Sequence, residues 1–104
     1  IFIEDRLIRY ATDLVQATRR PQDFQLELGH YIEFGASPRA SIALAQAGRA
    51  LAIIEGRDSV LPDDLKAVAP AVLRHRLVLT YEAEAEGVTN ADIIERMLLA
   101  VEVP

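Results

Sequence analysis

A chain of 104 residues has room for one domain, and a hydrophobic content of 51% lets it bury a core. Its net charge of −5 argues against a nucleic-acid-binding surface, which needs clustered Lys and Arg. No Cys is present, and no apolar run reaches the roughly 20 residues of a membrane span. We therefore expect residues 1–104 to be one cytoplasmic domain that binds neither membranes nor nucleic acid. Because the chain begins with Ile and has no signal peptide, we expect it to be part of a longer protein.

The first predicted element is an amphipathic helix that Pro21 stops at about Arg19 or Arg20. Spacing of three to four residues places one set of side chains on its buried face. That set is Ile3, Leu7, Tyr10, Ala11, Leu14, Val15 and Thr18.

Residues 22–36 have a different pattern, because Phe24, Leu26 and Leu28 alternate with polar residues and glycine. This alternation favours a short β-ribbon that turns near Gly29–His30. Residues 77–82 also alternate like a strand, and the alternative is that they continue the preceding helix.

A second long helix is predicted after Ser37, which can cap it, with Pro38 in the first helical position and Gly56 at the end. Apolar residues, many of them Ala, lie on most sides of this helix. This distribution predicts that it is the central and most buried helix of the domain.

Two further helices follow. Pro62 opens the first, with Asp63 and Asp64 in the turn where acids favour the helix dipole, and Pro70 is expected to kink or split it. Thr89 is predicted to cap the last helix, with Asp92 in a capping-box position. The fold class is therefore mainly α, a bundle of four to five helices with a short β-ribbon at about 24–34, at 77–82, or at both.

Searches for catalytic groups find none in this chain. It has no Gly-x4-Gly-Lys-Ser/Thr loop for a triphosphate and no recognisable Ser–His–acid triad. His30 and His75 lie far apart and lack metal-ligand spacing, so we expect no metal site.

Arg39 stands out because it lies in the first turn of the predicted long helix, where a cation opposes the helix dipole at a cost of about 0.3–1 kcal/mol. Backbone N–H groups and a guanidinium at a helix N-terminus make a good phosphate site. Spacing alone favours the alternative, an exposed Arg with its charge in water.

Several motifs follow one another along the chain. They are the first-helix residues Tyr10, Leu14–Val15 and Thr18–Arg19, the segments Gly35–Ala40 and Gly56–Val60 with Pro62–Asp64, and Val72–Arg76. Together they resemble the lid domain of MoxR-type AAA+ ATPases. The chain departs from the pattern at Leu61, where the family often has a Ser or Thr cap. That change is expected to weaken the helix start by about 0.5–2 kcal/mol unless another group substitutes.

The resemblance implies that Arg39 is the sensor-2 residue, directed at the phosphates of ATP, with Ser37 and Arg19 as supporting residues. ATP and Mg²⁺ would be bound by the parent protein and not by this chain alone, so the chain is not an enzyme although its parent hydrolyses ATP. The implied partners are the upstream AAA+ ATPase domain, ring neighbours in what is usually a hexamer, and proteins with a von Willebrand factor A domain. The implied activity is chaperone-like remodelling of other proteins.

Two other functions remain open from the sequence. The Val-x-Pro-x-Asp-Leu pattern of residues 60–65 is also typical of histone-like folds, which favours a dimerisation or adaptor module. Helices with short connections also fit a helix-turn-helix DNA-binding domain. The acidic net charge argues against both a histone-like protein and a DNA-binding domain.

Overall fold

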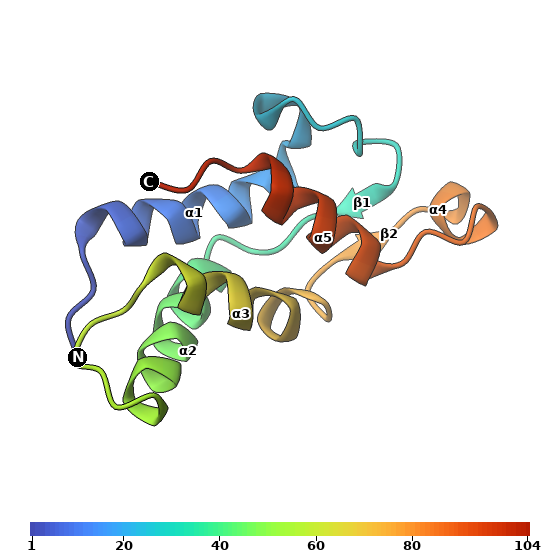
Figure 1. The fold of residues 1–104 in the computed structure, drawn as a ribbon. Coiled ribbons are helices and arrows are strands. Elements are labelled where there is room, and N and C mark those ends of the chain that lie inside the picture. Colours follow the sequence, from blue (N-terminus) through green and yellow to red (C-terminus); the bar gives the residue numbers. More distant parts are fainter.

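The helices form most of the chain, and a computed structural model describes all residues 1–104 (Figure 1). The predicted mainly α bundle is confirmed. The helices are α1 (Asp5–Arg19), α2 (Ala40–Ile54), α3 (Pro62–Leu73), α4 (Tyr81–Ala85) and α5 (Asn90–Ala100), with a 3-10 helix η1 (Pro21–Phe24) and strands β1 (Ile32–Phe34) and β2 (Val78–Leu79). None of these helices combines the length and the apolar character that a membrane crossing requires.

The core lies where α1, α2, α3 and α5 meet (Figure 1). Every residue predicted for the buried face of the first helix is buried, and α1 ends at Arg19, directly before Arg20 and Pro21. Helix α3 packs along α2, where Gly48 lets the fully buried Leu65 approach closely; a Cβ at Gly48 would lie 2.9 Å from Leu65 Cδ2. The α1 helix therefore follows from local sequence, whereas the α2–α3 contact depends on a small residue at one position.

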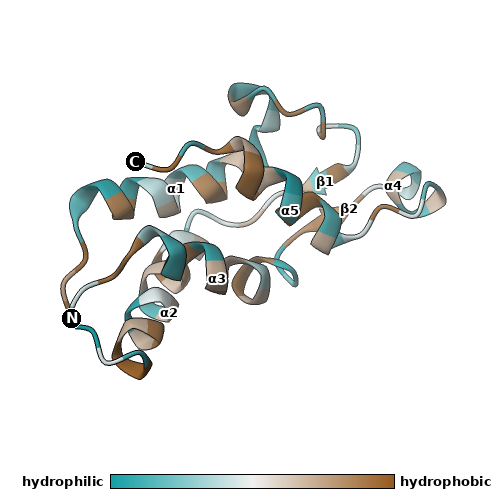
Figure 2. Cartoon of the chain, in the orientation of Figure 1, coloured by the Kyte–Doolittle hydropathy of each residue, from teal (hydrophilic) through white to brown (hydrophobic).

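The burial predicted for the second long helix is wrong. Only Ala40, Leu44, Gly48 and Ala52 of α2 are buried, because the other helices cover one side of it. On its other side Ile42 and Ile53 are each 59% exposed and Ile54 is 79% exposed. Figure 2 shows the C-terminal end of α2 as brown ribbon that projects from the bundle. Apolar side chains on a helix indicate a surface that packs against something. The sequence does not show whether that contact is made within the same chain or by a partner.

The predicted β-ribbon is confirmed in both regions, but the expected hairpin within residues 24–34 is wrong. β1 pairs antiparallel with β2, with Ile32 opposite Leu79 and Phe34 opposite Val78, so the strands come from the two regions that alternate. Phe24, where the predicted ribbon begins, lies at the end of η1, which Pro21 begins. The predicted turn near Gly29–His30 therefore does not join two strands. Pairing between distant segments is not encoded in local alternation, which explains the error.

The cap of α5 was predicted correctly, whereas one expected effect of Pro70 in α3 was not observed. The capping box of α5 is confirmed, because Thr89 Oγ1 accepts a hydrogen bond from Asp92 N (3.2 Å) and Asp92 Oδ2 accepts one from Thr89 N (3.0 Å). Of the two expected effects of Pro70, a kink or a split, the split is wrong, because α3 continues through Pro70 to Leu73. Pro70 lies three residues from the helix end, so α3 loses one intrahelical hydrogen bond there and remains continuous.

Candidate functional site

Arg39 lies exposed at the N-terminal end of α2. The regular helix begins at Ala40, so the predicted start at Pro38 is two residues early. Residues 37–39 form a turn that leads into the helix, in which Ala40 N donates to Ser37 O (2.8 Å). Ser37 Oγ accepts a hydrogen bond from Arg39 N (3.3 Å), the type of bond that a capping side chain makes. Ser37 and Arg39 are therefore brought together, through the Arg39 backbone.

The charge of Arg39 has no partner in this chain. The three ion pairs of the structure join Arg6 to Glu4, Arg20 to Asp23 and Arg57 to Asp64. The first turn of α2 contains no acidic residue. The guanidinium therefore opposes the helix dipole without compensation from a carboxylate, and it is free to meet an anion from outside the chain.

The segment before Arg39 is bound to the end of α1. Thr18 Oγ1 accepts a hydrogen bond from Ala36 N (3.0 Å), and Arg19 Nη1 donates one to Ala36 O (3.3 Å). Arg19, predicted as a supporting residue, thus contacts the chain three residues before Arg39. Sequence reasoning placed Thr18 on the apolar face of the first helix and among the residues that resemble the family, without a contact of its own. A Thr among aliphatic residues at a helix end was the signal that its hydroxyl needs a partner.

Gly35 allows this close approach between the segment and α1. A Cβ at Gly35 would lie 2.6 Å from the carbonyl carbon of Thr18 and 2.8 Å from Arg19 Cα. Both atoms belong to the backbone, so a larger residue would push the two segments apart. The Gly of the Gly35–Ala40 motif is therefore required by packing and not by backbone conformation.

The second motif, Gly56–Asp64, forms a structural clasp between α2 and α3. Gly56 has a φ of 75° and ends α2, and Arg57 N donates to Ala52 O (2.8 Å). The Arg57 guanidinium donates two hydrogen bonds to the Asp64 carboxylate, at 2.7 and 2.6 Å, and a third to Ser59 O. Arg57 therefore joins the end of α2 to the first turn of α3.

Asp64 also compensates for Leu61, the departure from the family pattern. Its Oδ2 accepts a hydrogen bond from Leu61 N (2.7 Å), which is the carboxylate half of a capping box. The hydrogen bonds from Arg57 lower the pKa of Asp64, and the bond from Leu61 N lowers it further, although burial of the side chain opposes both. The neighbouring Asp63 is exposed. The two adjacent acids therefore differ in their contacts, because only Asp64 bonds to Arg57 and to Leu61 N.

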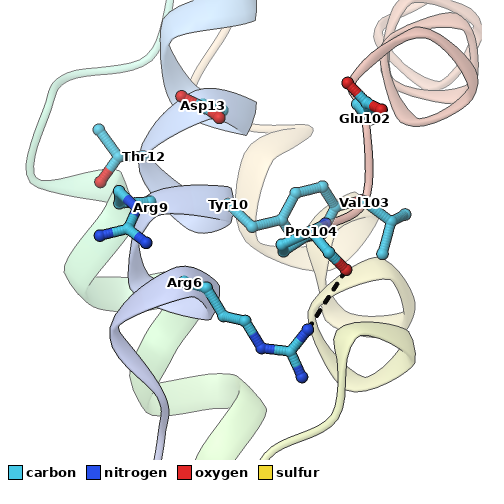
Figure 3. Close-up of a pocket in the computed structure, with 8 residues that line it drawn as sticks. All are labelled: Arg6, Arg9, Tyr10, Thr12, Asp13, Glu102, Val103 and Pro104. Atoms are coloured by element: carbon cyan, nitrogen blue, oxygen red, sulfur yellow. Dashed lines mark hydrogen bonds between the residues drawn. The ribbon is translucent and has the colours of Figure 1, made fainter.

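The largest cavity lies away from Arg39, between α1 and the C-terminal residues (Figure 3). It measures about 660 Å³, and Arg6 Nη1 donates a hydrogen bond across it to Pro104 O (3.4 Å). None of the predicted site residues lines it. No group of three or more His, Asp or Glu side chains gathers as a metal site, and His75 is exposed.

Comparison with known proteins identifies the class to which this fold and these motifs belong. The family model of the AAA lid domain matches residues 28–97, and the chain belongs to this family. The crystal structure of a candidate ATPase from Cytophaga hutchinsonii superimposes with a TM-score of 0.96 at 45% identity, over 100% of this chain and 32% of that one.

The particular branch follows from relatives that align over nearly the whole chain. Chaperone MoxR1 of Mycobacterium tuberculosis is 43% identical over 99% of this chain, and protein MoxR of Paracoccus denitrificans is 38% identical over 94% of it. The domain is thus a lid of the MoxR type, as the motifs predicted. The chain spans only 28% and 31% of the length of these two relatives.

Proposed function

We propose that this lid couples ATP binding and hydrolysis, in the ATPase domain of its parent protein, to chaperone-like remodelling of partner proteins. Arg39 is the sensor-2 residue in this proposal. The observation that carries it is an exposed Arg without an ion pair at the N-terminal end of α2, in a segment held to α1 through Ala36. Membership of the AAA lid family supports the same assignment.

The chemistry at Arg39 is recognition of an anion by charge and hydrogen bonds. A guanidinium is always charged and can donate two parallel bonds to a phosphate. ATP, held with Mg²⁺ by the parent's ATPase domain, supplies a γ-phosphate that hydrolysis removes. Arg39 then loses a partner that favoured one orientation of the lid. The difference in contacts between the two nucleotide states biases a hinge motion of the lid.

The exposed side of α2 also indicates which domain contacts this lid. Arg39, Ile42, Gln46, Ala50 and Ile53 are all exposed, and the 3.6-residue helical repeat places them within an arc of about 80°. We name this set the α2 stripe. A domain that presents a phosphate to Arg39 also meets the apolar residues of the α2 stripe. The ATPase domain of the same polypeptide is therefore the proposed cover, and neighbours in a hexameric ring and von Willebrand factor A domain proteins complete the proposed assembly.

ATP turnover of the full-length parent tests the assignment of Arg39. Arg39→Ala should lower turnover by about 10–100-fold, the range expected for losing hydrogen bonds from a charged group. Arg39→Lys should recover part of that loss, because it keeps the charge without the bidentate geometry. Arg9→Ala is the matched control, since Arg9 is also exposed on a helix and makes no ion pair. Equal turnover in Arg39→Ala and Arg9→Ala, with both lids folded, would refute the sensor-2 role of Arg39.

The α2 stripe also favours a second candidate, a dimerisation or adaptor module. An apolar helix side without cover can pair with a second copy of itself. Under this alternative the parent hydrolyses no ATP, and the chain forms dimers in sedimentation that Ile53→Glu disrupts. A monomeric chain within an ATP-hydrolysing parent would exclude this alternative.

A further inference from the structure

One buried peptide group joins the end of α1 to the segment that carries Arg39. Thr18 and Ala36 are 1% and 0% exposed, so water does not reach either of them. The Thr18 hydroxyl donates to Val15 O (2.6 Å) within α1 and accepts from Ala36 N (3.0 Å). Its donor and its acceptor are therefore both used, and Ala36 N has its partner in this side chain alone.

We propose that Thr18 is the positioning residue of Arg39. Its hydroxyl fixes the Ala36 peptide to α1 and thereby sets where Arg39 stands relative to that helix. The inference rests on the proposed function of Arg39 and adds a residue that does not touch the nucleotide. Arg19 assists at the next peptide group, Ala36–Ser37, by donating to Ala36 O.

The short path from Ala36 to Arg39 has little freedom. Pro38 has a restricted φ, Ser37 Oγ accepts from Arg39 N, and Ala40 N donates to Ser37 O. Gly35 lies in backbone contact with Thr18 and Arg19 on the other side of Ala36. A displacement of the Ala36 peptide is therefore passed on to Arg39 and is not absorbed between them.

The chemistry of a buried amide makes the Thr18 hydroxyl necessary. An N–H group away from water that loses its acceptor is strongly penalised, so the segment moves to find another partner. A small displacement of a guanidinium from its productive place has a large effect on the rate of a reaction that depends on orientation. Loss of one hydroxyl on α1 should therefore appear as loss of Arg39 function.

The test compares Thr18→Val with Thr18→Ser in the full-length parent. Valine keeps the shape without the hydroxyl, whereas serine keeps the hydroxyl. We expect Thr18→Val to lower ATP turnover at least about fivefold, the lower end of what an unsatisfied buried amide produces, and Thr18→Ser to restore most of it. Thr12→Val is the matched control, because Thr12 is exposed on the same helix and its hydroxyl bonds only to Ile8 O.

Two readouts separate positioning from a general structural role. The double variant Thr18→Val with Arg39→Ala should turn over ATP no more slowly than Arg39→Ala alone, because both changes remove one interaction. Hydrogen exchange of the Ala36 amide should accelerate about tenfold or more in Thr18→Val, with α3 and α5 still protected. Losses that multiply in the double variant would contradict the proposal.

The outcomes also separate this inference from the function on which it rests. Unchanged turnover in Thr18→Val, together with a loss in Arg39→Ala, would refute the role of Thr18 and leave Arg39 in place. Unchanged turnover in Arg39→Ala would refute the proposed function itself. If Thr18→Val does not fold, Arg19→Ala is the replacement, because Arg19 is exposed and its guanidinium bonds to Ala36 O. Full turnover in Arg19→Ala would then refute the positioning of Ala36.

Discussion

Replacing Asp64 by Asn should destabilise the lid far more than the same change at the adjacent Asp63. The Asp64 side chain is 5% exposed and accepts hydrogen bonds from Arg57 and Leu61 N, whereas Asp63 is exposed. Asparagine keeps the size of the side chain but removes the charge and one acceptor oxygen. Both variants lose one acid from the first turn of α3, so their difference isolates the clasp.

The expected magnitude follows from the bonds that the substitution weakens. Hydrogen bonds to a charged group contribute about 1.5–3 kcal/mol. Water around the partly exposed Arg57 side chain reduces this contribution. We therefore expect Asp64→Asn to lower the free energy of unfolding by about 1–3 kcal/mol. In a domain of this size that corresponds to a decrease in Tm of roughly 5–15 °C. Asp63→Asn should lower the free energy of unfolding by no more than about 0.3–1 kcal/mol, which is what an exposed acid contributes through the helix dipole. Urea and thermal denaturation of the chain at neutral pH measure both values.

The pH dependence supplies an independent check with a defined sign. The folded-state pKa of Asp64 lies below its ordinary value because Arg57 and Leu61 N bond to the carboxylate. The resulting stabilisation is complete above the unfolded-state pKa of about 3.9 and is lost as the pH falls through the lower folded-state pKa. The gap between the original chain and Asp64→Asn should therefore close below about pH 4. Equal losses in Asp63→Asn and Asp64→Asn, or a gap that persists in acid, would refute this reasoning.

Further stability predictions concern the cap of α5, the core of α3 and the α2 stripe. Thr89→Ala should cost about 1 kcal/mol in urea denaturation, because it removes the acceptor of Asp92 N. Leu65→Ala should cost about 2–5 kcal/mol, since Leu65 is fully buried against Gly48; a cost below 1 kcal/mol would contradict the α2–α3 packing. Ile53→Ser should change the stability of the chain by less than about 0.5 kcal/mol while weakening attachment of the ATPase domain in the parent, measured by limited proteolysis between the domains.

Local signals in the sequence were sufficient for α1, for the end of α2 and for the start of α5. The apolar repeat and Pro21 define α1, and the Thr89–Asp92 pair defines the start of α5. Gly56 ends α2 because a positive φ follows the helix. Each of these features depends on residues within one or two turns of each other, which is the range that sequence patterns describe well.

Features that depend on distant residues were missed. The β1–β2 pairing joins segments more than forty residues apart, and alternation alone does not name a partner strand. The exposed side of α2 was predicted as buried because its apolar residues do not distinguish cover within the chain from cover by a partner. In the candidate site, Arg39 stood out in the first turn of the predicted helix and Ser37 as its cap, and the family resemblance implied their roles. The role proposed for Thr18 rests on its contact with Ala36, which the sequence does not reveal.

The affinity of the full-length parent for ATP and for ADP, with and without Arg39→Ala, tests the central claim most directly. If Arg39 recognises the γ-phosphate, Arg39→Ala should weaken ATP binding by about tenfold or more and leave ADP binding nearly unchanged, so that the preference for ATP declines. Isothermal titration with Mg²⁺ present measures both affinities on the same preparation. An unchanged ratio of ATP to ADP affinity would contradict the assignment of Arg39 as the sensor of the γ-phosphate.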